Sequence, residues 1–155
     1  LEAHLPRAHR LGPRLVALQS TAGAMFVAST LAGTVIATLA SWDELGDRLS
    51  MLPLIGAIFG MLMIGSAIVF PLVFAGESAT GDSEEGKIKS AVQSITVEYL
   101  VRFALVQAAF FTNLLVLMLD LHTVTLGIVG LATITFLFLF PFQSRFIRAV
   151  EKRLI

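Results

Sequence analysis

The chain has 155 residues, of which 56% are hydrophobic, with a formal net charge of +0 and a mean hydropathy of +0.85. This composition is too apolar for a water-soluble domain of this size, and the balanced charge argues against a nucleic-acid partner, which would need a basic patch. The sequence holds no cysteine, so it offers neither a disulfide framework nor a thiolate metal site. We therefore expect a single all-α transmembrane domain over residues 1–155, surrounded by membrane lipids and without a separate catalytic domain.

Two apolar stretches in the first half of the chain are long enough to cross a membrane, which takes roughly 20 helical residues for about 30 Å of hydrocarbon. The first covers about residues 15–40 and is followed by Trp42, a residue type enriched at membrane interfaces. The second covers about residues 52–75, with Pro53 in its first turn, where a missing amide is tolerated, and Pro71 near its end. Together they predict a first transmembrane hairpin.

A second pair of apolar stretches follows a polar segment at 76–90, whose Gly, Ser and acidic residues are typical of a flexible cytoplasmic linker. The third stretch covers about residues 95–119, and its helix is expected to begin already near Glu85. The fourth covers about residues 124–142. Only four residues separate the third stretch from the fourth, so the sequence predicts a second, tight hairpin.

Basic residues outside the apolar stretches predict the orientation. Seven of them flank the first and the fourth stretch: Arg7, Arg10, Arg14, Arg145, Arg148, Lys152 and Arg153. Because Lys and Arg are retained on the cytoplasmic side, both termini are expected in the cytoplasm. The two loops on the other side carry Arg48 as their one basic residue, whereas the 76–90 linker has mixed charge and agrees with this orientation only weakly.

A weak internal repeat relates the two hairpins. Positions in the first and third stretches match without gaps at Leu15 and Leu100, Val16 and Val101, Ala24 and Ala109, and Phe26 and Phe111. The second and fourth stretches match at Gly60 and Gly130, Ile64 and Ile134, and in the Phe-Pro pairs at 70–71 and 140–141. These matches fit a parallel duplication of one hairpin, and equally fit chance similarity between apolar segments.

One face of the third stretch carries a polar stripe. At 100° per residue, Glu98, Arg102 and Asn113 fall on the same side of the helix. The stripe could serve as an ion or proton path, or Glu98 and Arg102, one turn apart, could form a structural ion pair at the cytoplasmic interface. We favour the structural ion pair, because the apolar residues Leu105 and Ala109 interrupt the stripe.

Small and amide-bearing residues in the spans are candidate helix-packing contacts. Gly56 and Gly60 form a small-xxx-small pair in the second stretch. One side of the first stretch carries the small residues Gly23, Thr30, Thr34, Ala37 and Ser41. Gln107 lies on the face of the third stretch opposite the stripe, where a buried amide contributes about 1 kcal/mol to helix association. Such faces serve folding within one chain and assembly between chains alike.

The sequence offers no recognisable catalytic or cofactor site. Its three histidines, His4, His9 and His122, lie outside the spans, which argues against a bis-histidine haem, and no carboxylate cluster suggests a metal. No nucleophile stands beside a base, and there is no phosphate-binding loop. We therefore expect a non-enzymatic protein without cofactors. The basic residues after the fourth stretch could meet anionic lipid headgroups, although setting the orientation explains them as well.

A local resemblance concerns the second hairpin. The segment from Val101 to Phe111, followed by a hairpin that ends in Phe-Pro and a basic tail, resembles small uncharacterised bacterial four-helix membrane proteins with a pattern close to Arg-Ala-Leu-x-Glu-x-Ala-x-Phe. It is also distantly similar to the hairpins of rotary ATPase proteolipids, which pack in rings on small residues and carry protons on a mid-membrane carboxylate. Gln107 stands where the four-helix proteins tend to have Glu, and an amide cannot carry a proton.

The leading hypothesis from the sequence is a non-enzymatic inner-membrane protein that acts by helix packing, either as an accessory subunit of a membrane complex or as a homo-oligomer. The alternative is a small ion or proton channel or transporter that uses Glu98, Arg102 and Asn113. Small multidrug exporters also have four helices, but they depend on a carboxylate in the first span, where this chain has none.

Overall fold

The computed structural model describes residues 5–39, 50–74 and 83–154, with side chains from residue 12 onward, Phe74 excepted. Within these ranges the chain is all-helical and contains no strand, which confirms the expected all-α class. Its five helices are α1 (Leu5–Leu39), α2 (Met51–Phe74), α3 (Glu84–Leu119), α4 (Thr123–Leu139) and α5 (Gln143–Leu154). By length and composition, α1, α2 and α3 can each cross a membrane, and α4 with α5 adds a fourth span if this bent pair is taken as one.

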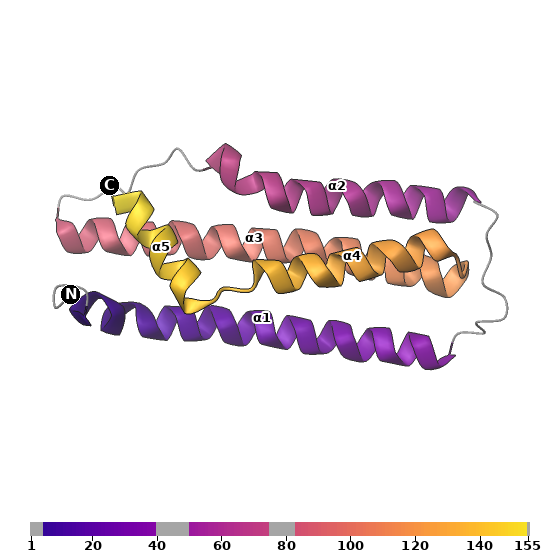
Figure 1. Cartoon of the computed structure of the whole chain (residues 1–155), viewed down its shortest axis with the longest axis horizontal. Helices are drawn as coiled ribbons and strands as arrows, with labels where there is room; N and C mark the ends of the chain where they lie inside the picture. Colours follow the sequence, from indigo (N-terminus) through magenta and orange to yellow (C-terminus); the bar gives the residue numbers. More distant parts are fainter. Residues whose placement is uncertain (1–4, 40–49, 75–82, 155) are drawn as a thin grey trace.

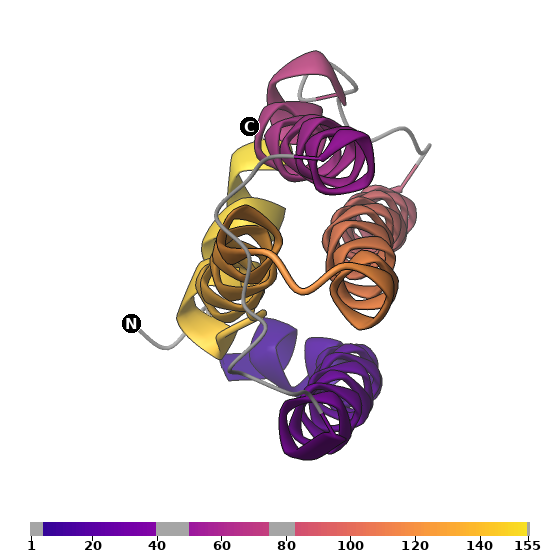
Figure 2. The ribbon, with the colours of Figure 1, turned by 90° about the vertical axis from the view of Figure 1, so that its right-hand side faces the viewer.

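The helices lie lengthwise beside one another, and α3 is at the centre of their contacts. Helix α1 begins and α5 ends at one end of the bundle, here called the termini end (Figure 1). At the opposite end, the turn end, α1 and α3 finish while α2 and α4 begin. Seen from the turn end, α1 and α2 lie on opposite sides of the α3–α4 pair (Figure 2). Helix α3 packs against all four other helices.

Helix α3 begins at Glu84, close to the start near Glu85 that the sequence predicts. Ser83 caps the helix, since its Oγ accepts a hydrogen bond from the Gly86 backbone N–H at 3.1 Å. Glu84 and Glu85 occupy the first turn, where the helix dipole favours negative charge. Residues 84–90 are therefore helical, while the rest of the expected 76–90 linker up to residue 82 lies outside the described residues.

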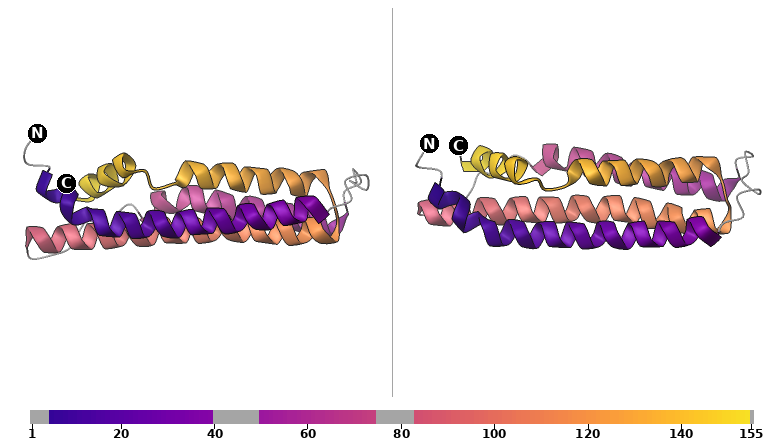
Figure 3. Two further views of the ribbon diagram at one scale, coloured as in Figure 1. Left: turned by 90° about the horizontal axis from the view of Figure 1, so that it is seen from below. Right: turned by 60° about the horizontal axis from the view of Figure 1, so that its bottom comes forward.

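The helix of the fourth expected span, 124–142, ends at Leu139, two residues before Pro141. Phe140 follows this helix, α4, and takes φ −53° and ψ 132°, the extended backbone that a residue before proline prefers. Helix α5 then starts, and its axis is bent by 67° from that of α4 (Figure 3). With 17 residues, α4 is only about 26 Å long, slightly less than the thickness of the hydrocarbon layer.

Helix α5 is amphipathic, and its apolar side returns to the bundle. Phe146 and Val150 are buried, with 0% and 2% of their surface exposed, and the Phe146 ring lies 6.2 Å from that of Tyr99. The basic residues Arg145 and Arg148 remain exposed. A segment that reads in the sequence as a basic tail is thus a helix that packs on α3 at the termini end.

Candidate functional site

The first candidate site lies around a backbone carbonyl of α2 that has no hydrogen-bond donor within its own helix. Pro71 is inside α2 and has no N–H, so the carbonyl of Ala67, four residues earlier, lacks its helical donor. Arg102 of α3 supplies one, because its Nε donates to Ala67 O at 2.9 Å. A buried carbonyl would otherwise remain unsatisfied at an apolar position, since Ala67 itself is 0% exposed.

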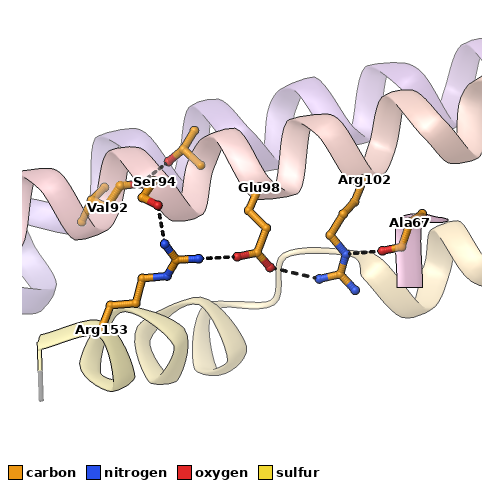
Figure 4. Close-up of polar contacts among 7 residues, drawn as sticks. Ala67, Val92, Ser94, Glu98, Arg102 and Arg153 are labelled. Carbon is orange, nitrogen blue, oxygen red and sulfur yellow. Dashed lines mark hydrogen bonds and ion pairs between the residues drawn. The ribbon is translucent and has the colours of Figure 1, made fainter. Parts of the chain in front are cut away.

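Around Arg102 lies a group of four polar side chains, Ser94, Glu98, Arg102 and Arg153, here called the Glu98 cluster (Figure 4). Arg102 Nη1 is 3.5 Å from Glu98 Oε1, one helical turn away. Arg153 of α5 donates from Nη2 to Glu98 Oε2 at 2.8 Å and from Nη1 to Ser94 Oγ. Glu98 is thus held between two arginines that come from different helices.

The Glu98 cluster is largely shielded and carries a net positive charge, with two guanidinium groups for one carboxylate. The side chains of Glu98, Arg102 and Arg153 are 14%, 16% and 11% exposed. Charges in such surroundings are stabilised only when paired and hydrogen-bonded, and these are. The cluster joins α2, α3 and α5 at one place. Each arginine is paired with Glu98, so the cluster is a structural clasp, that is, a set of polar contacts that holds these helices together.

Asn113, the third residue of the expected polar stripe, lies in a different contact. It is 0% exposed, and its Nδ2 donates to Ala109 O at 2.9 Å. Its amide faces Gly56 and Gly60 of α2: a Cβ built on Gly60 would lie 2.5 Å from Asn113 Nδ2 and from Ile128 Cγ2. Only glycine permits this approach, so the small pair of α2 packs within the chain.

The turn end of the bundle contains further buried polar groups. His122 is 2% exposed and caps α4, because its Nδ1 accepts from the Val124 N–H at 3.1 Å. Within the described residues, its Nε2 has no hydrogen-bond partner, nor do Thr125 Oγ1 and Asn113 Oδ1. Next to them, Ser50 Oγ donates to Asp120 Oδ2 and so links the start of α2 to the end of α3.

The second candidate site is a cavity of about 290 Å³ between α1, α3 and α4, here called the α1–α4 cavity. Phe26 and Phe136 stack with ring centroids 5.9 Å apart at its end nearer the termini. From Thr30 to Leu39, α1 has no residue that the rest of the chain buries. The cavity therefore follows the half of α1 that packs loosely on its neighbours.

Gln107 and Ser29 form the polar part of the α1–α4 cavity. Ser29 Oγ lies 2.7 Å from Gln107 Oε1 and 2.8 Å from Met25 O, so its one proton can be donated to either acceptor. The two side chains are 6% and 8% exposed, so this hydrogen bond between α1 and α3 is buried. The cavity contains none of the stripe residues Glu98, Arg102 and Asn113.

The remaining residues that the sequence analysis named lie outside both candidate sites or outside the described side chains. Gly23 has open space where a Cβ would be, whereas Gly33, which the sequence did not single out, lines the α1–α4 cavity. His4 and His9 lie outside the residues whose side chains are described. Among the described residues, no three His, Asp or Glu side chains gather as they would around a metal ion. Arg153 was missed as a partner of Glu98, since no local pattern connects them.

Known proteins give no guide to the function of this chain, so the Glu98 cluster and the α1–α4 cavity are the basis for a proposal. No family model, curated protein or solved structure matches the chain. The resemblance to four-helix proteins and proteolipid hairpins thus stays a prediction. What the residues can do chemically is to clasp helices through the Glu98 cluster and to offer an uncharged, partly polar cavity within the apolar part of the bundle.

Proposed function

We propose that this chain is a non-enzymatic, multi-pass protein of the bacterial inner membrane that acts through helix packing, as a homo-oligomer or as a subunit of a larger membrane complex. Both hairpins then insert in the same direction, with the termini end and the Glu98 cluster at the cytoplasmic side. The basic residues near that end support this orientation: Arg14, Arg145, Arg148, Lys152 and Arg153.

The observation that carries the proposal is the exposed side of α1. Six residues at alternating spacings of four and three form an exposed line along it, here called the outer seam: Ala17, Thr21, Ala24, Ala28, Leu31 and Val35. Four of them are small, and this spacing is that of a helix that packs against a second helix. On the helical wheel the outer seam lies opposite the side of α1 that lines the α1–α4 cavity.

The exposed side of α2 differs from the part of the outer seam between Ala17 and Ala28, where all four seam residues are small. It presents bulky side chains such as Ile55, Ile58 and Leu62, which are 62%, 54% and 61% exposed. Bulky aliphatic residues suit contact with lipid tails, whereas small residues allow helix backbones to approach closely. In addition, only 11% of the apolar window of α1 is buried within the chain, against 28% for α2 and 50% for α3.

The absence of cysteine makes a direct test possible. Single cysteines are introduced at Ala24 or Ala28 in the outer seam, and at Ile58 or Leu62 on α2 as matched controls, and the membranes are oxidised before extraction. We expect crosslinked species from the seam variants, either a dimer of this chain or, after addition of a bifunctional thiol reagent, a conjugate with another subunit.

A second measurement completes this test. The native mass of the complex, extracted gently from its own membrane, identifies every chain that co-purifies with it. A foreign subunit in fixed ratio would establish the accessory role, and a defined mass of copies alone the homo-oligomer. A monomer at every detergent concentration, together with equal crosslinking of seam and control cysteines, would exclude both.

A further inference from the structure

The shape of the α1–α4 cavity restricts what can fill it. On α1 the lining extends from Phe26 to Ala37, twelve residues whose Cα atoms span about 17 Å along the axis. A volume of about 290 Å³ spread over that length suits a narrow, chain-like molecule.

The lining also restricts the charge of the occupant. Its thirteen residues include aromatic, aliphatic and hydroxyl side chains and one amide, but no Asp, Glu, Lys, Arg or His. In apolar surroundings an ionised ligand group would need a counter-charge. The lining of the α1–α4 cavity therefore favours an uncharged ligand.

The Gln107 amide supplies an unpaired polar group inside the cavity. Ser29 has one hydroxyl proton and two acceptors within reach, Met25 O and Gln107 Oε1. If the proton goes to Gln107 Oε1, then Gln107 Nε2 has no partner among the described residues. If it goes to Met25 O, the amide turns to donate to Ser29 Oγ, and Gln107 Oε1 is left free. One end of an amide that is 8% exposed thus has no partner in either arrangement.

Hydroxyl oxygens across the cavity complement this amide. The proton of Thr30 goes to Phe26 O at 2.8 Å, and that of Thr133 goes to Val129 O at 2.9 Å. Both oxygens keep lone pairs that can accept a hydrogen bond from a ligand. A ligand hydroxyl group can donate to a threonine oxygen or to Gln107 Oε1, and it can accept from Gln107 Nε2. A ketone or an ether can only accept.

Ser29 and Gln107 lie too deep in the bundle for the headgroup of a phospholipid to reach them. Ser29, the partner of Gln107, precedes the end of α1 at Leu39 by ten residues, roughly 15 Å. This is about half the thickness of the hydrocarbon layer. Phosphate and glycerol groups lie at the membrane surface, so the matching hydroxyl belongs to a molecule that enters the hydrocarbon layer whole.

We propose that the α1–α4 cavity binds a neutral, chain-like lipid molecule with a single hydroxyl group, and that this hydroxyl is bound at Gln107. Long-chain alcohols and other small uncharged lipids with one hydroxyl have this chemistry. The apolar chain lies along α1 between Phe26 and Ala37, where Gly33 leaves the space for it. The inference goes beyond assembly through the outer seam, and its test is independent of oligomeric state.

The test uses the full chain in phosphatidylcholine nanodiscs and three photoactivatable probes of equal length: hexadecanol, hexadecane and palmitate. We expect saturable labelling by the hexadecanol probe, with adducts on residues 26–37 and 129–136, and about five- to tenfold less labelling by the other two probes, as the loss of a buried hydrogen bond implies. Unlabelled hexadecanol should compete with the hexadecanol probe.

Variants assign the labelling to the cavity. Gly33→Leu fills it and should abolish labelling, whereas Gly130→Leu is the matched control, since a Cβ at Gly130 meets nothing within 4 Å. Gln107→Leu should reduce hexadecanol labelling to the level of hexadecane. Because this change also removes the bond to Ser29, Thr133→Val is a second variant: it keeps the shape, removes an acceptor and should lower hexadecanol labelling without changing that of hexadecane.

Three results would overturn the proposal. Equal labelling by hexadecanol and hexadecane in the wild type would mean that bulk lipid chains fill the cavity. Labelling that persists in Gly33→Leu would place the probe elsewhere. Strongest labelling by palmitate would show that the site accepts a charged group. None of these outcomes bears on crosslinking at Ala24 and Ala28, so failure here is distinct from failure of the assembly proposal.

Discussion

At the scale of single residues, the Glu98 cluster shows what a local pattern can and cannot predict. The pairing of Glu98 with Arg102 follows from their spacing on one helix face, and their charges lie 3.5 Å apart. Arg153 is 55 residues away in sequence and reaches Glu98 only because the chain bends at Pro141 and brings α5 back onto α3. Its hydrogen bond to Glu98, at 2.8 Å, is the shorter of the two contacts.

A charge-neutralising substitution tests this clasp. Arg153→Gln should lower the free energy of unfolding by about 1 to 3 kcal/mol, the usual range for a charged hydrogen bond whose partner stays shielded. Arg148→Gln is the control, since Arg148 is exposed on the same helix and its Nε donates to Ser144 O within α5. Unfolding by a denaturing detergent in micelles measures both variants, and equal stability of the two would contradict the clasp.

At the scale of helices, the contact of α2 with α3 and α4 depends on one missing side chain. Gly60→Ala places a Cβ 2.5 Å from Asn113 and Ile128, which are 0% and 8% exposed and have little room to move. We expect a loss of about 1 to 3 kcal/mol from overpacking. Gly65→Ala, five residues on, meets nothing within 4 Å and should be neutral or slightly stabilising, because alanine favours helix. Thermal unfolding in detergent compares them.

The contact of Arg102 with Ala67 O leads to a prediction of non-additivity. Pro71→Ala returns a helical donor to Ala67 O, so the carbonyl no longer depends on Arg102. Arg102→Met should therefore destabilise the chain less in the Pro71→Ala background than in the wild type, with a coupling of about 1 kcal/mol. A double-mutant cycle measures this difference, and strict additivity would mean that the two residues act independently.

The same helices limit the proposed duplication. Gly60 is in close contact with α3 and α4, whereas its counterpart Gly130 has open space around it. Ile64 is 4% exposed and Ile134 is 53% exposed. Pro71 remains inside α2, but Pro141 follows the end of α4. The matched letters therefore occupy different surroundings, and the duplication stays a prediction.

At the scale of the whole molecule, composition and apolar length predicted the helical class and the candidate spans, because the hydrocarbon thickness sets how many apolar residues a helix needs. The α1–α4 cavity could not be predicted in this way. In a membrane, residues that face lipid are as apolar as those that face another helix, so the sequence does not show which side of α1 packs. Among its lining residues the sequence analysis singled out Gln107, Thr30, Thr34 and Ala37, all as packing contacts rather than as parts of a cavity.

The proposed orientation makes the two ends of the bundle distinguishable. Single cysteines are introduced at Ser144, in the first turn of α5, and at Met51, the first residue of α2, because both positions are exposed. In intact cells, a membrane-impermeant thiol reagent should label the cysteine at Met51 and reach that at Ser144 only after the inner membrane is permeabilised. The reverse pattern would place the termini outside the cytoplasm.

The separation of the two arginines along the chain has a consequence for biogenesis. A ribosome adds roughly 5 to 20 residues per second, so the 55 residues from Glu98 to Arg153 take roughly 3 to 11 s to synthesise. Until Arg153 has been synthesised, Arg102 is the one arginine of the Glu98 cluster that can pair with Glu98. The ion pair of Arg102 with Glu98 within α3 can thus form first, and the contact of Arg153 with Glu98 joins α5 to α3 afterwards.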